Sequence, residues 1–138
     1  MDSWPRDIAA ITLFVEDLAA AKQFYQHVFD LPIHFEDPHS AVFKFGDTLI
    51  NLLVTEQAGD LIGPAAVAPR EAGARFQFTL EVDDVDAMCE RLSERGVPLL
   101  NGPMDRPWGI RTAAFTDPAG HVWEIAGHAA GQGDPPPK

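Results

Sequence analysis

Residues 77–85, QFTLEVDDV, decide the fold, because they repeat the pattern of residues 10–18, AITLFVEDL, at an offset of 67. In the second copy, apolar residues strictly alternate with Gln77, Thr79 and Glu81. This period of two is typical of a strand with one buried face. An internal repeat of this length predicts two copies of one supersecondary unit.

An amphipathic helix is predicted after each of these strands. Its apolar stripe has helical spacing of three and four residues, and in the second copy it consists of Val85, Met88, Cys89 and Leu92. The first copy repeats the stripe with Leu18, Ala21, Phe24, Tyr25 and Val28. Asp17 is placed to cap the first helix, Asp83 or Asp84 to cap the second, and Gly96 to end the second. Both helices are expected to cover the apolar face of a sheet.

A β-hairpin is predicted to complete each unit. Short β-prone runs flank turn residues at 46–47 and at 117–120, with strands expected over 41–45, 48–54, 111–116 and 121–126. The predicted fold class is therefore α+β, with two βαβββ modules. The modules are expected at residues 1–54 and 75–127, joined by a linker or flap at 55–74 and followed by a disordered tail at 128–138, as one folded domain overall.

Composition narrows the possible partners and the compartment. The 138 residues carry a net charge of −11, which repels phosphate backbones and anionic membrane surfaces, so neither nucleic acid nor membrane is an expected partner. No apolar run has the length of a membrane span, and the first residues lack the pattern of a signal peptide. Cys89, the single cysteine, is interpreted as a buried small hydrophobe. We expect a cytoplasmic protein.

The repeated pattern resembles the vicinal oxygen chelate superfamily, which includes glyoxalase I, extradiol dioxygenases and bleomycin-resistance proteins. The likeness is carried by ITLFVEDL, KQFYQ, FQFTLEVDDVD and WGIRTAAFTDPAGHVWEI, and it extends over about residues 8–127. It implies two βαβββ modules whose mixed sheets curl around a concave pocket. It also implies a homodimer.

The resemblance further implies where a metal ion would be held. Metal-using members place His, Glu or Gln at three positions and Glu at a fourth, and these positions are here Ala10, Asn51, Gln77 and Glu124. Ala10 has no donor atom, and Asn51 offers only an amide oxygen, so no transition metal and no other cofactor is expected. If a divalent metal did bind, Gln77, Glu124 and Asn51 would supply oxygen atoms, which suit a hard ion such as Mg or Mn.

The strand faces that carry Gln77 and Glu124 also predict a small-molecule site, because apolar and polar residues alternate onto them. Its expected ligand-binding residues are Phe14, Asn51, Gln77, Thr79, Trp108, Arg111 and Glu124. Trp108 belongs to a WGxR sequence that is similar to metal-free bleomycin-resistance-like proteins, and it could stack on a planar or cationic group or only pack a hairpin. Arg111 could orient a carboxylate, pair with Glu124, or form a surface ion pair.

Glu124 is the one candidate catalytic residue. Burial could raise its pKa and make it a general base, or the carboxylate could simply be hydrogen-bonded to Arg111 or Gln77. The first hypothesis is therefore a protein that sequesters a small aromatic molecule without a transition metal, as in antibiotic resistance. The alternative is a metal-dependent lyase or isomerase of glyoxalase type. An extradiol-dioxygenase relative ranks last, since two His and a carboxylate for ferrous iron are missing, and a metal-independent enzyme built on Glu124 stays open.

Overall fold

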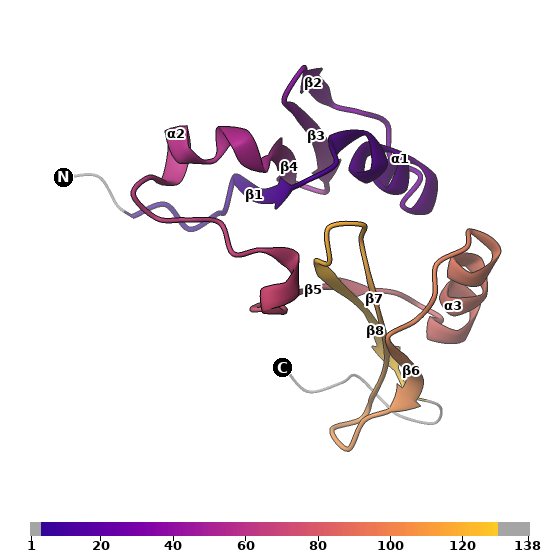
Figure 1. Cartoon of the computed structure of the whole chain (residues 1–138). Coiled ribbons are helices and arrows are strands. Elements are labelled where there is room, and N and C mark those ends of the chain that lie inside the picture. The colour runs from indigo at the N-terminus through magenta and orange to yellow at the C-terminus, as the bar shows by residue number, and fades with distance from the viewer. Residues whose placement is uncertain (1–3, 130–138) are drawn as a thin grey trace. The chain divides into compact units, whose positions relative to one another are not determined.

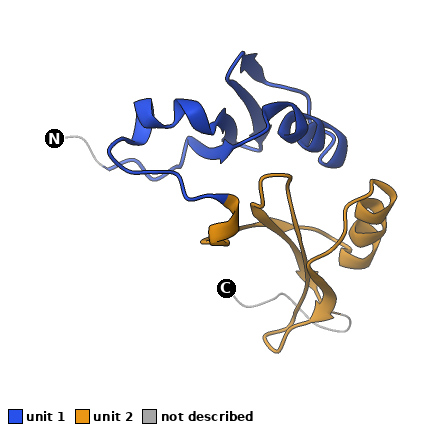
Figure 2. Cartoon of the chain, in the orientation of Figure 1, with its two compact units in different colours: residues 1–69 blue, residues 70–138 orange. Residues whose placement is uncertain are grey.

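The computed structural model describes residues 4–129, which form two compact units divided between Pro69 and Arg70 (Figure 2). Each unit has its own sheet and its own long helix (Figure 1). No helix within the described residues is long and apolar enough to cross a membrane.

The first unit is a βαβββ module. Its elements are β1 (Ala10–Val15), α1 (Leu18–Val28), β2 (Phe35–Asp37), β3 (Ser40–Phe45) and β4 (Thr48–Val54). The strand order in the sheet is β1-β4-β3-β2, with β1 parallel to β4 and the other pairs antiparallel. The sheet is therefore mixed, as the predicted module requires.

The second unit repeats this topology. Its elements are β5 (Gln77–Glu81), α3 (Val85–Glu94), β6 (Asn101–Asp105), β7 (Ile110–Thr116) and β8 (Val122–His128). The order is β5-β8-β7-β6, again with one parallel pair, β5 with β8. The predicted α+β class with two βαβββ modules is confirmed.

Helix caps lie where the sequence pattern placed them. The Asp17 carboxylate accepts a hydrogen bond from the Ala20 amide at 3.0 Å, and Asp84 does the same for the Ala87 amide at 3.0 Å. The sequence left Asp83 and Asp84 open as the second cap, and the structure selects Asp84. Gly96 follows α3 with a φ of +76°, a conformation that favours glycine, and the helix ends there.

Two segments differ in detail from the sequence prediction. The expected linker contains short helical turns, η1 (Thr55–Gln57), α2 (Gly59–Ile62) and η2 (Arg70–Ala72). His128, expected to begin the tail, is the last residue of β8 because it pairs with Ile110 of β7. The rest of the expected tail, from residue 130, lies outside the described residues.

Large apolar side chains fill the space between each helix and its sheet. In the first unit, Tyr25 of α1 is fully buried and its ring lies 5.4 Å from that of Phe43. In the second unit, Trp123 is 2% exposed and its ring lies 4.8 Å from that of Phe78, while Val85 of α3 lies close to Gly127 of β8. Burial of such side chains contributes about 1.5–3 kcal/mol each, so these contacts hold each helix to one face of its sheet.

Candidate functional site

Each sheet has a second face that carries no helix, here called the helix-free face. Because side chains alternate along a strand, residues next to the buried helix-facing ones point to this face. In the first unit these residues are Ala10, Thr12, Phe14, Leu49, Asn51 and Leu53. In the second unit they are Gln77, Thr79, Glu81, Val122, Glu124 and Ala126. Most of the predicted site residues therefore lie on the helix-free face of their own unit.

Glu124 is held by a threonine. Its carboxylate oxygen Oε1 accepts a hydrogen bond from the Thr79 hydroxyl at 2.9 Å, and only 8% of Glu124 is exposed. The two residues face each other across the parallel pair β5 and β8. Sequence reasoning offered Arg111 or Gln77 as partners and did not find this bond, although the parallel register makes it possible.

The first unit has an equivalent pair with different chemistry. Thr12 corresponds to Thr79 at the repeat offset of 67, and it faces Asn51 across β1 and β4. The Asn51 amide nitrogen donates to the Thr12 hydroxyl at 3.4 Å. The two modules thus place a neutral amide and a carboxylate at equivalent points, each beside a threonine hydroxyl.

Gln77 and Phe14 lie on the same faces as these pairs. Gln77 is exposed at the start of β5 and faces Val122. Phe14 is half-buried in β1 and faces Leu53 of β4. Phe14 therefore adds apolar area beside Asn51 in the first unit, and Gln77 adds an amide to the face of Glu124 in the second.

Arg111 lies on the opposite, helix-bearing face. It faces Gly127 in the β7–β8 register, and its guanidinium forms ion pairs with Asp86 of α3 and Asp105 of β6, both at 3.0 Å. These hydrogen bonds, first that of Asp86, raise the pKa of Arg111 above its ordinary value. The suggested pairing of Arg111 with Glu124 is wrong, because strand alternation sends the two side chains to different faces.

Trp108 lies in the turn between β6 and β7. The turn is closed by a hydrogen bond from the Gly109 amide to the Arg106 carbonyl at 3.1 Å. The side chain is not sealed into the hairpin, since Trp108 is 46% exposed. It is therefore accessible for stacking.

Arg106 is a residue that the sequence reasoning missed. Its Nε donates to the Thr112 hydroxyl at 2.8 Å, and its Nη2 donates to the Asn101 side-chain oxygen at 3.4 Å. Thr112 faces Ala126 across β7 and β8 and so belongs to the helix-free face. The sequence gives one sign of this residue, its place in RPWG beside Trp108. Its contact with Asn101 could not be predicted, because that contact depends on a register shift in β6 between Asn101 and Met104.

Among the described residues, the contact between His121 and Asp117 is structural and belongs to no metal-binding group. His121 Nδ1 lies 2.9 Å from an oxygen of the buried Asp117, whose carboxylate also accepts from the amides of Ala119 and His121. This arrangement braces the turn between β7 and β8. Across residues 4–129, no three His, Cys, Asp or Glu side chains gather as a metal site.

The donor chemistry at the four family positions does not fit a transition metal. Ala10 supplies nothing, Asn51 and Gln77 supply amide oxygens, and the Glu124 carboxylate is engaged by Thr79. Catalytic metal sites ordinarily use three protein ligands, with imidazole, thiolate or carboxylate as the usual donors. These four side chains therefore do not supply the ligands of a catalytic transition-metal site.

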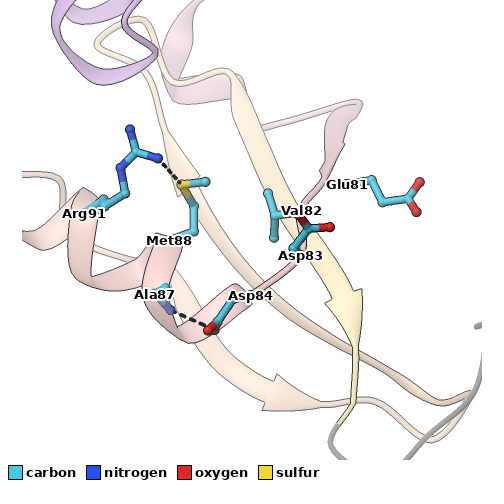
Figure 3. A pocket seen from close by; sticks show the side chains of 7 residues that line it. All are labelled: Glu81, Val82, Asp83, Asp84, Ala87, Met88 and Arg91. Atoms are coloured by element: carbon cyan, nitrogen blue, oxygen red, sulfur yellow. Dashed lines mark hydrogen bonds between the residues drawn. The ribbon is translucent and has the colours of Figure 1, made fainter.

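A hollow of about 340 Å³ lies at the start of α3 (Figure 3). It is lined by Glu81, Val82, Asp83, Asp84, Ala87, Met88 and Arg91. The Asp84 carboxylate already caps the helix, and Arg91 Nη1 lies 4.0 Å from Met88 Sδ. Only Glu81 of this lining belongs to the helix-free face, so the hollow is distinct from the predicted site.

Paired βαβββ modules with polar groups on their helix-free strands define the vicinal oxygen chelate class of proteins. The family model of the Glyoxalase/Bleomycin resistance protein/Dioxygenase superfamily matches residues 7–125. The chain belongs to this superfamily.

Three solved structures place the chain among members with different described roles. A glyoxalase/bleomycin resistance protein/dioxygenase from Nocardioides is 26% identical, with a TM-score of 0.85 over 100% of this chain and 91% of that one. Lactoylglutathione lyase from Agrobacterium tumefaciens is 27% identical, with a TM-score of 0.72 over 89% of this chain and 94% of that one. TnmS3, an antibiotic-binding protein from Streptomyces sp. CB03234, is 27% identical, with a TM-score of 0.70 over 93% of this chain and 100% of that one.

Proposed function

We propose that this protein binds a small aromatic molecule on its helix-free strand faces without a transition metal. The donor chemistry of the four family positions carries the proposal, since only Glu124 among them has a charged oxygen. The similarity to TnmS3, described as an antibiotic-binding protein, supports the same role. Sequestration of a compound requires shape and hydrogen bonds but no bond-breaking group.

The proposal gives each residue a separate role. Glu124 accepts a hydrogen bond from the ligand and is kept in place by Thr79, at 2.9 Å. Gln77 offers an amide group on the same face of the second unit. The first unit offers a surface of its own, with the Asn51 amide and the apolar area of Phe14. Trp108, 46% exposed, stacks on the aromatic ring. Arg111 has no role in binding, because Asp86 and Asp105 hold it on the other face.

The direct test is a thermal-shift screen of the purified protein against aromatic compounds of differing charge. We expect a subset to raise the melting temperature, and we expect Trp108→Ala and Glu124→Gln each to weaken that rise. Asp83→Asn is the control, since Asp83 is exposed and does not cap α3. A broad screen that yields no stabilising compound would contradict the proposal.

One observation favours a second function, a metal-dependent lyase. The similarity to lactoylglutathione lyase is as strong in sequence as the similarity to TnmS3, at 27% identity each. Turnover of a thiohemiacetal substrate that appears on addition of Ni, Zn, Mn or Fe would establish this function. Added metal that changes neither turnover nor melting temperature would eliminate it.

A further inference from the structure

Arg106 is a cation on the helix-free face that lacks a partner of opposite charge. Both of its hydrogen-bond acceptors, Thr112 Oγ1 and Asn101 Oδ1, are neutral. Within residues 4–129 it forms no ion pair, whereas Arg111, five residues later, forms two. Within the described residues, Arg6, Lys44, Arg70 and Arg75 also form no ion pair, but Arg106 differs from them because two neutral side chains hold its guanidinium in place.

The two hydrogen bonds fix the orientation of the guanidinium. An arginine has five N–H donors, and Thr112 and Asn101 use one each, which leaves donors directed elsewhere. Thr112 is 1% exposed and cannot move aside, so Nε is anchored. A guanidinium fixed in this way presents its fork to a planar oxyanion with little loss of entropy on binding.

The backbone of β6 is shaped to bring Asn101 to this arginine. The register shifts between Asn101 and Met104, so that three residue steps in β6 match two in β7. Gly102 lies in the shift with a φ of +85°, and a Cβ there would be 2.5 Å from the Thr112 carbonyl oxygen. The shift puts both Asn101 and Met104 opposite residues of the helix-free face, Ala114 and Thr112.

Small residues separate Arg106 from Glu124 along the sheet. Glu124 faces Ala114, and Thr112, which anchors Arg106, faces Ala126. Both alanines belong to the helix-free face and are 7% exposed each, so buried methyl groups lie between the cation and the carboxylate. The exposed Trp108 lies two residues after Arg106 in the same turn.

We propose that Arg106 binds the carboxylate of an aromatic acid whose ring stacks on Trp108. This inference rests on the proposed function and specifies the class of its ligand. The net charge of −11 opposes an anion only at long range, and this effect is screened beyond about 8 Å at physiological salt. A direct hydrogen-bonded contact with a guanidinium is screened far less.

The test compares three probes with one aromatic frame: 2-naphthoate, 2-naphthamide and 2-naphthylmethylammonium. Calorimetric titration of the full chain is expected to give at least about tenfold tighter binding of the naphthoate than of the naphthamide. Arg106→Gln should abolish this preference, and Arg106→Lys, which keeps the charge without the fork, should retain part of it. Arg91→Gln is the matched control, because it removes the same charge from an exposed position on α3 and should leave the preference intact.

A second readout locates the contact and controls for folding. The Nε–H resonance of Arg106, identified by its loss in Arg106→Gln, should move on addition of naphthoate and stay in place with naphthamide. Equal affinity for the three probes, or a naphthoate preference that survives Arg106→Gln, would overturn the inference and leave the proposed function standing. Failure of all three probes to bind at millimolar concentration would also overturn the inference, whereas the proposed function is decided by the broad thermal-shift screen.

Discussion

At the scale of single residues, the two modules differ in the side chain that faces the shared threonine, which is Asn51 in the first and Glu124 in the second. Thr12 and Thr79 are the same residue at equivalent points, but one donates to Glu124 and the other accepts from Asn51. A hydrogen bond to a charged group is ordinarily stronger than one between neutral groups. The bond from Thr79 to Glu124 is therefore expected to stabilise the fold more than the contact between Asn51 and Thr12 does.

The first prediction concerns the bond between Thr79 and Glu124. Thr79→Val removes the donor to a carboxylate that is 8% exposed, so we expect the free energy of unfolding to fall by about 1–2 kcal/mol. Thr12→Val is the matched control and removes only the longer, neutral contact of 3.4 Å. Urea unfolding of both variants measures the difference, and an equal loss in the two would show that Thr79 has no special role.

The second prediction concerns Cys89. Partial burial raises the pKa of its thiol, the charge of Asp86 raises it further, and Arg111 offsets part of the rise. A raised pKa leaves less thiolate at a given pH, so alkylation by iodoacetamide should reach half its maximal rate at a higher pH in the native protein than in urea. Asp86→Asn should bring the native midpoint down. Identical midpoints in the native and the unfolded protein would show that the native environment does not raise the pKa of the Cys89 thiol.

At the scale of elements, the sequence patterns predicted strands and helices well where the period was long and clean. Alternation along β5 and the spacing of Val85 to Leu92 along α3 reflect one buried face each, and burial is what selects the element. The short turns η1, α2 and η2 have no such periodicity, because a single helical turn does not bury a stripe. The register shift in β6 was equally invisible, and it decides where Asn101 and Arg106 meet.

The third prediction separates the two aspartates before α3. Asp84→Ala removes the cap of the Ala87 amide and is expected to lower the free energy of unfolding by about 1 kcal/mol. Asp83→Ala, one residue earlier, should change it by less than about 0.5 kcal/mol, because surface substitutions outside such features have small effects. Thermal unfolding of the pair measures this, and equal melting temperatures would refute the cap.

At the scale of the whole molecule, the sequence predicted the fold class and the strand faces but not the contacts made on them. Alternation placed Gln77, Thr79 and Glu124 on one face, as the structure has them. Alternation along β7 also sets the face of Arg111, but it could not show that Asp86 would pair with this arginine, since that contact joins residues 25 positions apart. Nor could it find the role of Arg106, whose hydrogen bonds depend on the register between β6 and β7.

The fourth prediction is the homodimer expected for this class of fold. Sedimentation equilibrium at micromolar concentration should give twice the mass of the chain. If the dimer forms, ligand binding should be measured on the dimer, because a second chain would bury additional surface. A mass of one chain across that concentration range would rule the dimer out.

Elemental analysis decides whether this protein works without a transition metal. The measurement is the metal content of native protein purified without chelators and without an affinity metal, with the melting temperature compared before and after chelation. We expect far less than one metal ion per chain and an unchanged melting temperature. One ion per chain, with a melting temperature that falls on chelation, would contradict this expectation and favour the metal-dependent lyase.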